Sequence, residues 1–471
     1  MSKTYYPTIG LEIHAELKTS TKMFCCSKND PDEIRPNVNI CPVCMAHPGT
    51  LPVINKKAVE HVIKTGIALG GKVADFTEFD RKNYFYPDIP KGYQISQYKY
   101  PIVSGGHLKG VDITRIHLEE DTANSKHDRG DFSLVDFNRA GVPLMELVTE
   151  PVIKSAEQAG AFARELQVLL RSLGVSDADM EKGQMRVEAN ISISTDPNKF
   201  GTKVEVKNLN SFRSAESAIK YELERMTKLY EEGKEADIVQ ETRGWDEVKG
   251  TTFSQRKKES SHDYRYFPDP DLPKLKLSEV FDIDELNKNM PELPWDKRER
   301  YTKSGLSIET SEFFVQNNLL GNYFESVIGA FHGDIEKIKL ASNYIATDIV
   351  AHMKANQDVS LPTPINVTEL INMIAENKIS SRGAKDILEH MHGHDDHPMK
   401  IALEKGLLQK SDEGELKQLI EKVIAENETV VVEYRQGKQA SLQYLIGQIM
   451  KVSKGSANPQ VAKKLLEEIL N

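Results

Sequence analysis

The stretch T-I-G-L-E-I-H-A-E-L, residues 8–17, alternates apolar and polar side chains with a period of two. Such alternation is typical of a β-strand that buries one face and exposes the other. The polar face of this strand brings together Glu12, His14 and Glu16. The same pattern recurs at residues 185–193 and more weakly at 203–207. These segments are therefore predicted to be strands of one antiparallel sheet.

Helical signals lie between the strands and dominate the last third of the chain. Ser155 and Gln158 form a capping-box signal, and Gly174 stands where a helix would end. From about residue 291 the apolar residues follow helical spacing, and Asn458-Pro459 opens a last helix. We predict an α+β domain at 1–290, an all-α domain at 291–396 and a small all-α tail at 397–471. The His-rich segment 390–397 is interpreted as a solvated linker.

Composition narrows the classes of function. A chain of 471 residues has room for about three domains. Its net charge of -10, from 61 basic and 71 acidic residues, means that any RNA contact must come from a local patch. The N-terminus lacks a signal-peptide pattern and no apolar run would span a membrane, so a cytoplasmic protein is expected. No Walker or G-x-G-x-x-G motif is present, so a nucleotide must be held in another way.

The four cysteines are clustered at Cys25, Cys26, Cys41 and Cys44. In a chain without a secretory signal, such clusters favour a metal site over disulfides. Cys41-Pro-Val-Cys44 has the spacing of a zinc knuckle, whereas adjacent cysteines rarely bind one tetrahedral zinc ion together. We expect a structural zinc ion whose fourth ligand is Cys26, His47 or water. A reduced cluster without metal is the alternative.

Acidic residues on separate strands indicate a second kind of site. Glu12 and His14 share a strand face, and the acidic run 117–121 follows a β-type segment at 111–116. Carboxylates that converge from several strands are suited to Mg²⁺, which prefers oxygen ligands and is often shared with phosphates. On spacing alone, an ordinary solvent-facing strand surface is the favoured interpretation of these acids.

Longer segments carry a family resemblance. They are GLEIHAELKT (10–19), FDRKNYFYPDIPKGYQIS (79–96), HLEEDTANSKH (117–127), VDFNRAGVPLMELVTEP (135–151), VEVKNLNSFRS (204–214), ETRGWDE (241–247), SSHDYRYFPDPDLP (260–273) and EYRQGKQASLQYLIGQIMKVSKGSANP (433–459). They span nearly the whole chain and resemble the hallmark segments of the GatB/GatE family. The chain has no room for the inserted domain of the GatE branch, so the resemblance favours the GatB branch.

The resemblance implies a fold, an activity and partners. The fold would be a "cradle" domain related to glutamine synthetase, a helical domain and a YqeY-type tail that helps to hold tRNA. The activity would be ATP-dependent phosphorylation of the side-chain carboxylate of Glu on tRNA(Gln) or Asp on tRNA(Asn), followed by displacement of phosphate by ammonia. Nothing in the chain resembles an amidase. A GatA-type glutaminase and a small GatC-type subunit are therefore the implied partners in a heterotrimer.

The resemblance also implies functional residues. The family's Mg²⁺ and kinase-site positions match Glu12, His14, Glu120 and Glu146, and its lysines near the ammonia route or the phosphates match Lys82 and Lys91. The implied cofactor-binding positions are Arg186, Glu188, Asn190, Lys207 and Asn210. At Glu188 the family more often has Asp, and one extra methylene moves the carboxylate oxygens by roughly 1.5 Å.

The tail contains a basic run inside an acidic protein. Between residues 434 and 464 there is no Asp or Glu, and the predicted tRNA-contacting residues are Arg435, Lys438, Lys451 and Lys454. Two other interpretations stay open. One is a zinc-ribbon RNA-binding protein without catalysis, which leaves the aligned acids unexplained. The other is a ligase for a small acid that uses free ammonia, which would need no RNA-binding tail.

Overall fold

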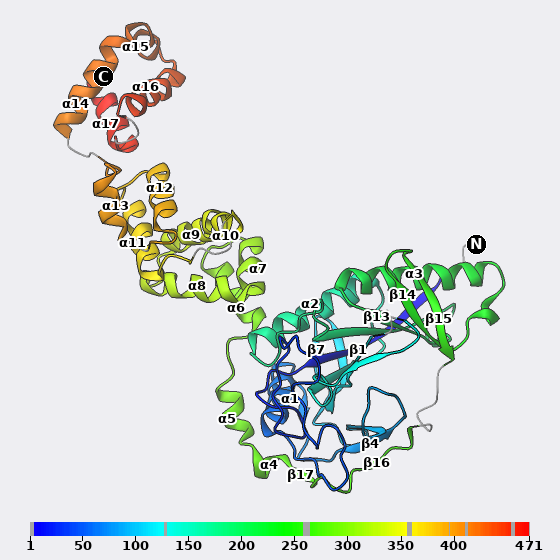
Figure 1. Cartoon of the computed structure of the whole chain (residues 1–471). Coiled ribbons are helices and arrows are strands. Elements are labelled where there is room, and N and C mark those ends of the chain that lie inside the picture. The colour runs from blue at the N-terminus through cyan, green and yellow to red at the C-terminus, as the bar shows by residue number, and fades with distance from the viewer. Residues whose placement is uncertain are drawn as a thin grey trace. The chain divides into compact units, whose positions relative to one another are not determined.

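The computed structural model of the chain consists of two compact units, Met1–Pro294 and Trp295–Asn471 (Figure 1). It describes residues 4–126, 130–257, 264–355, 360–394, 396–409, 413–453 and 457–470. The first unit is a mixed α+β structure built around a large sheet, and the second is helical. The boundary predicted near residue 396 stays a prediction.

A ten-stranded sheet forms the centre of the first unit, in the order β15-β14-β13-β12-β1-β11-β8-β6-β2, with β7 paired to β8. Neighbouring strands are antiparallel except for β13 and β14. The bounds are β1 Tyr6–Glu16, β2 Lys72–Val73, β6 Val103–Ser104, β7 His107–Leu108, β8 Val111–Glu120, β11 Pro143–Thr149, β12 Met185–Ser194, β13 Val204–Leu209, β14 Glu241–Asp246 and β15 Thr251–Lys257. The predicted strands at 8–17, 185–193 and 203–207 are confirmed as β1, β12 and β13.

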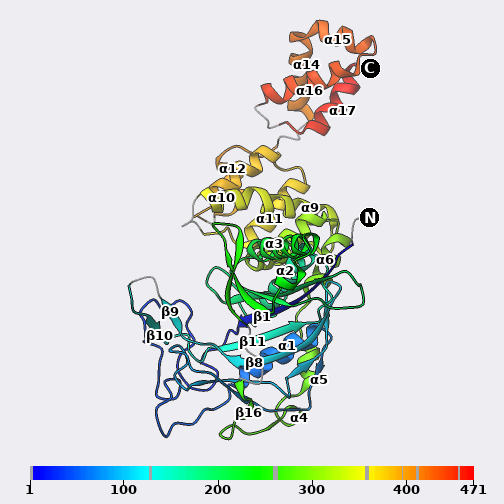
Figure 2. The ribbon, with the colours of Figure 1, turned by 90° about the vertical axis from the view of Figure 1, so that its right-hand side faces the viewer.

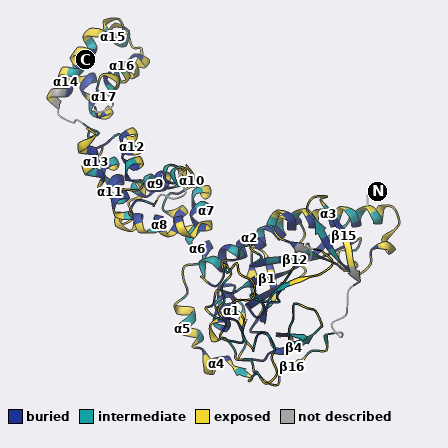
Figure 3. Ribbon diagram, in the orientation of Figure 1, coloured by how far each residue is buried: buried dark blue, intermediate teal, exposed yellow. Residues whose placement is uncertain are grey.

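The two faces of this sheet differ, as the alternation in β1 predicts. Ile9, Leu11 and Ile13 are at most 1% exposed and belong to the core. Helices α2 (Ala156–Ser172) and α3 (Phe212–Glu231) pack on each other and against the sheet, as Figures 2 and 3 show. Ser155 caps α2 by accepting a 3.1 Å hydrogen bond from the backbone N–H of Gln158. The predicted capped helix is therefore confirmed.

A smaller three-stranded sheet lies on the other side of the large sheet, away from α2 and α3 (Figure 1). It consists of β16 (Phe267–Pro268), β4 (Asp80–Asn83) and β5 (Tyr93–Ser96), and β5 packs against β8. The other elements of this unit are α1 Lys56–Ala68, β3 Phe76–Thr77, β9 Asn124–Lys126, β10 Leu134–Asp136, η1 Glu235–Asp237, β17 Leu275–Lys276, α4 Leu277–Val280 and α5 Ile283–Lys288. The small sheet therefore stands over the polar face of β1.

The second unit contains two groups of helices along the chain. The first group comprises α6 Pro294–Lys303, α7 Ile308–Gln316, α8 Asn318–Ile328, η3 Gly329–Phe331, α9 Ile335–Tyr344, η4 Ile345–Ile349, α10 Val350–Ala355, α11 Pro364–Ala375, α12 Ser381–Met391 and α13 Pro398–Glu404. Helix α13 packs against α11 and α12. The segment interpreted as a linker is helical at its start, because His390 and Met391 form the last turn of α12.

The second group comprises α14 Glu413–Glu426, α15 Glu428–Arg435, α16 Gln439–Val452 and α17 Pro459–Leu470. These four helices share one apolar core, to which Leu416, Leu445 and Leu466 contribute. The Asn458 side chain accepts hydrogen bonds from the N–H groups of Gln460 and Val461, as expected for the cap of the last helix. None of the helices in the described ranges is long and apolar enough to cross a membrane.

Candidate active site

A polar cavity of about 430 Å³ lies on the polar face of the large sheet, under the small sheet. It is lined by acids and cations from β1, β4, β8, β11, β12 and β13 and from the segments that follow them. The charged residues are Glu12, His14, Lys82, Asp88, Glu119, Asp121, Glu146, Arg186, Glu188 and Lys207. A volume of this size is within the range of small-molecule sites. The cavity is therefore the candidate active site.

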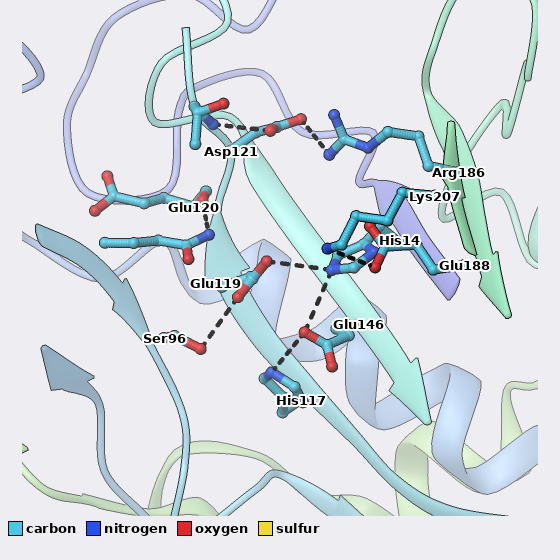
Figure 4. A network of polar contacts seen from close by, with 12 residues as sticks. His14, Ser96, His117, Glu119, Glu120, Asp121, Glu146, Arg186, Glu188 and Lys207 are labelled. Carbon is cyan, nitrogen blue, oxygen red and sulfur yellow. Dashed lines mark hydrogen bonds and ion pairs between the residues drawn. The ribbon is translucent and has the colours of Figure 1, made fainter. Parts of the chain in front are cut away.

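The pairing of β1, β11 and β8 brings together the residues at the centre of the polar cavity. His14 on β1 lies opposite Glu146 on β11, which in turn lies opposite His117 on β8. His14 Nε2 is 3.3 Å from Glu146 Oε2 and 3.6 Å from Glu119 Oε1 (Figure 4). His117 Nε2 is 3.4 Å from the same Glu146 oxygen. His14, Glu119 and Glu146 can each offer one ligand atom within 4.8 Å of the others, so they form a candidate metal group.

His14 and Glu146 stabilise each other's charged form. Burial tends to lower the pKa of His14, but the hydrogen bond to Glu146 and the charges of Glu146 and Glu119 raise it to about 9. Burial tends to raise the pKa of Glu146, but the charge of His117 and hydrogen bonds from both histidines hold it well below its usual range. Glu146 is thus a carboxylate between two imidazoles. Its lowered pKa keeps this carboxylate ionised, so it attracts a cation.

A second group of acids lies beside the first. Glu12 lies opposite Glu188 on β12, and these two with the buried Glu205 on β13 also form a candidate metal group. Lys207 Nζ is 2.8 Å from Glu188 and 3.6 Å from Glu205. Burial and the charges of neighbouring acids raise the pKa of Glu12, and the Asn190 amide donates a 2.8 Å hydrogen bond to it. Lys207 thus lies beside a group of three carboxylates.

Cations line the rest of the cavity. Arg186 Nη2 forms a 2.8 Å ion pair with Asp121, which directly follows β8. Lys82 on β4 approaches from the small sheet, with Nζ 5.2 Å from the centre of the Tyr264 ring. Burial tends to lower the pKa of Lys82, but the charge of Glu119 and other nearby groups raises it. A cavity that combines fixed cations with carboxylates suits a ligand made of phosphate and metal.

Not every residue expected from the sequence lies in this cavity. The Glu120 carboxylate points away from His14 (Figure 4). It forms a 2.7 Å ion pair with Lys91. Both residues line a different cavity of about 250 Å³, together with Cys25 and Cys44. Asn210 follows β13, is exposed and does not line the polar cavity.

Glu119, rather than Glu120, lies beside His14. Extending the alternation past residue 116 would have found it. Ile116 and Leu118 are buried apolar residues, so His117 and Glu119 project to the polar face. Glu120 does not belong to this set, and its carboxylate accepts a 2.9 Å hydrogen bond from the backbone N–H of Ile95 on β5. Glu205, which sequence reasoning also missed, follows the same alternation with Lys207 on β13.

Three of the four cysteines come together. Cys25, Cys41 and Cys44 can each offer a sulfur within 4.8 Å of the others, whereas Cys26 is exposed and lies outside the group. The fully buried Lys22 places Nζ 3.8 Å from Cys44 Sγ. A hydrogen bond from Cys25 and the charge of Lys22 outweigh burial and lower the pKa of Cys44 to about 4. The shift favours the thiolate form of Cys44, which metals bind, whereas the hydrogen bond to Cys44 and burial raise the pKa of Cys25.

The described basic residues of the tail that were predicted to contact tRNA are exposed, and one of them pairs with an acid. Arg435, Lys438 and Lys451 are exposed. Lys438 Nζ is 2.8 Å from Glu433, which lies one residue outside the acid-free run. Lys454 lies outside the described residues. The Glu433 carboxylate therefore offsets part of the charge that Lys438 could present to RNA.

Comparison with protein-family models gives two matches. Residues 7–282 match the GatB/GatE catalytic domain. Residues 322–470 match the GatB domain. The first match contains the whole polar cavity and the cysteine group, and the second contains α9 to α17 and most of α8.

Curated proteins match the chain from end to end. A protein of Persephonella marina, named as the B subunit of aspartyl/glutamyl-tRNA(Asn/Gln) amidotransferase, is 42% identical over 99% of both chains. A protein of Caldanaerobacter subterraneus with the same name is 43% identical over 99% of both chains. The chloroplastic/mitochondrial B subunit of glutamyl-tRNA(Gln) amidotransferase from Sorghum bicolor is 43% identical over 98% of this chain and 86% of its own length.

Proposed function

This chain belongs to the GatB/GatE family, and on that premise we propose that it amidates the side chain of Glu on tRNA(Gln), Asp on tRNA(Asn), or both, using ATP. The observation that carries the proposal is the polar cavity. It combines two groups of carboxylates with the cations Lys82, Arg186 and Lys207. The relatives named as components of an amidotransferase match the chain along its full length. The activity is that of a carbon–nitrogen ligase.

The reaction requires an activated acid, because a carboxylate resists attack by an amine. In the proposed first step, a side-chain carboxylate oxygen takes the γ-phosphoryl group of ATP, and ADP leaves. In the second step, ammonia forms a C–N bond to the acyl carbon as the C–O bond to phosphate breaks. Inorganic phosphate leaves and the nitrogen loses a proton. The cations of the cavity stabilise the charge that develops on the phosphoryl oxygens.

The donor atoms of the cavity fit Mg²⁺. Glu119 and Glu146 beside His14, and Glu12, Glu188 and Glu205 next to them, provide the oxygen ligands that this ion prefers. Among the described residues, the Asn190 side-chain oxygen is buried without a hydrogen-bond partner, which leaves a further oxygen beside Glu12. Bound Mg²⁺ would neutralise phosphate charge. The protein's own side chains would bind the substrates. Arg186 and Lys207 would bind phosphate oxygens of ATP, and Lys82 would bind the acyl phosphate.

The cysteine group fits a structural zinc ion with three thiolate ligands, Cys25, Cys41 and Cys44. Cys26 is not proposed as a ligand, because it is exposed and outside the group. The buried ammonium of Lys22 offsets part of the charge of the thiolates. His47 lines the cavity next to Cys25 and Cys44, but it is also exposed and outside the group, so water is proposed as the fourth ligand. Lys91 and Glu120 share this cavity and are proposed to act near the ammonia route.

We further propose a division of labour along the chain. The first unit would be the glutamine-synthetase-like cradle, and α14 to α17 the YqeY-type part that holds tRNA through Arg435, Lys438 and Lys451. The relatives are named as one component of a larger complex, for which a GatA-type glutaminase and a GatC-type small subunit are proposed. The competing interpretation as a small-acid ligase does not account for the match to the GatB domain at residues 322–470. The non-catalytic interpretation leaves the cavity without a role.

The test uses the chain assembled with its two partner subunits, misacylated Glu-tRNA(Gln) and Asp-tRNA(Asn), ATP and glutamine. Glu146→Gln should abolish amidation and the tRNA-dependent release of ADP, because it removes a carboxylate from the metal group without removing volume. Binding of misacylated tRNA should stay within a few-fold of wild type. Glu181→Gln, an exposed turn residue, is the matched control. Wild-type turnover by Glu146→Gln would refute the proposed site.

A further inference from the structure

Five tyrosines form a continuous array of rings at the small sheet. Tyr86 contacts Tyr84 with ring centres 6.0 Å apart, and Tyr84 contacts Tyr264 at the same distance. Tyr264 contacts Tyr266 at 6.1 Å, and Tyr266 stacks on Tyr98 with ring centres 4.5 Å apart and an interplanar angle of 14°. The array joins two segments that lie far apart in the sequence. We call these five residues the tyrosine array.

The array begins at the active-site cavity and reaches solvent. Tyr84, Tyr86 and Tyr264 line the cavity. Tyr86 is 55% exposed and Tyr98 is 56% exposed, so both ends of the array present ring faces or edges to solvent. Exposed aromatic rings at a ligand cavity are more informative than scattered surface aromatics, because they form one connected surface.

A rigid scaffold holds the array. The Asn83 side-chain amide donates hydrogen bonds to the backbone oxygens of Tyr264 and Arg265, at 3.1 and 2.9 Å. The N–H of Tyr98 donates to the Asp80 carboxylate at 2.9 Å. These bonds fix the backbone that carries Tyr264 and Tyr98, which lowers the entropy cost of stacking on this part of the array.

We propose that the tyrosine array is a stacking site for the unpaired terminal bases of the aminoacyl-tRNA acceptor end. The inference rests on the proposed function and specifies how that function selects its substrate. The acidic side chain that reacts is joined to the terminal ribose through a short chain and one ester bond. When its carboxylate reaches the cavity, the terminal base must lie at the cavity mouth, where Tyr86 is exposed.

The chemistry of the array favours a nucleobase. Single-stranded nucleic acids are commonly recognised by bases stacked on aromatic side chains. Lys82 Nζ lies 6.0 Å from the Tyr84 ring centre and 5.2 Å from that of Tyr264, so the array adjoins the cation that is proposed to bind the acyl phosphate. The chain as a whole carries a charge of -10, which does not attract RNA. Stacking on local aromatic rings therefore has to contribute to the affinity for the acceptor end of tRNA.

The experiment measures steady-state kinetics of the assembled complex. Tyr86→Ala should raise the KM for misacylated tRNA on the order of 10- to 100-fold, because losing one stacked ring costs about that factor. It should leave the KM for ATP within about twofold. Tyr86→Phe keeps the ring and should restore most of the affinity for tRNA. Phe200→Ala, which removes an aromatic side chain 75% exposed elsewhere, is the control.

A second measurement reports stacking directly. Misacylated tRNA with 2-aminopurine as its terminal base should lose fluorescence on binding to wild type and to Tyr86→Phe, and should lose much less with Tyr86→Ala. An unchanged KM for tRNA in Tyr86→Ala, with wild-type amidation intact, overturns the inference but not the proposed function. A rise in the KM for ATP alone also overturns it, since the rings would then hold the adenine of ATP. Absence of ATP-dependent amidation in wild type would overturn the proposed function instead.

Discussion

His14 should be protonated at neutral pH in protein stripped of metal ions by a chelator. Its pKa is raised from 6.5 to about 9, because contacts with Glu146 and Glu119 outweigh burial. A pKa that is higher in the folded state stabilises that state in proportion to the shift. At roughly 1.4 kcal/mol per pKa unit, this shift contributes about 3 kcal/mol to the free energy of unfolding. The contribution is fully present below pH 6.5 and is lost as the pH rises through about 9.

The assay is urea unfolding in chelator across about pH 6 to 10, wild type against His14→Gln. The chain has two tryptophans, Trp245 in the first unit and Trp295 in the second. A Trp295→Phe background therefore lets Trp245 fluorescence report on the unit that contains His14. The difference in unfolding free energy between wild type and His14→Gln should shrink by about 3 kcal/mol between roughly pH 6.5 and 9.5.

A matched control comes from a histidine outside the cavity. The His107 side chain is 59% exposed, and His107→Gln should keep the wild-type pH dependence in the alkaline range. NMR of histidine-labelled protein provides an independent reading, in which one imidazole absent from His14→Gln should titrate near pH 9. The same pH dependence in wild type and His14→Gln would refute the reasoning, as would a His14 signal that titrates at or below the ordinary value of 6.5.

Three other predictions follow from where the side chains lie. Glu119→Gln should reduce kcat for amidation more than Glu120→Gln, because only Glu119 reaches the His14 group; equal losses would contradict the placement. Purified protein should contain about one zinc ion, and Cys41→Ser should lower both the zinc content and Tm, whereas the same change at Cys26 leaves both unchanged; elemental analysis without zinc would count against the site. Lys451→Ala should reduce the slope of log affinity for tRNA against log salt by nearly one, and an unchanged slope would remove this residue from the RNA contact.

Local features of the fold could be predicted from short segments alone. The alternation at 8–17 and 185–193 determines strand identity and which side chains share a face, because side-chain direction in a strand repeats every two residues. The capping residues Ser155 and Asn458 determine where two helices begin, because the interactions involved span only a few residues. Long family-like segments were sufficient to identify the catalytic part of the chain.

The make-up of the site was decided by contacts between residues far apart in the chain. The register that places His14 against Glu146 and Glu12 against Glu188 depends on strand pairing, which no single segment encodes. Alternation along β8 could have predicted Glu119 beside His14, but the partner of the Glu120 carboxylate, the backbone N–H of Ile95 on β5, depends on the tertiary structure. Cys26 is separated from its neighbour Cys25, because in this bent segment only Cys25 joins the other two cysteines while Cys26 is exposed. Lys438 forms an ion pair with Glu433, because the turn after α15 brings the two side chains together. This pairing offsets part of the positive charge of Lys438.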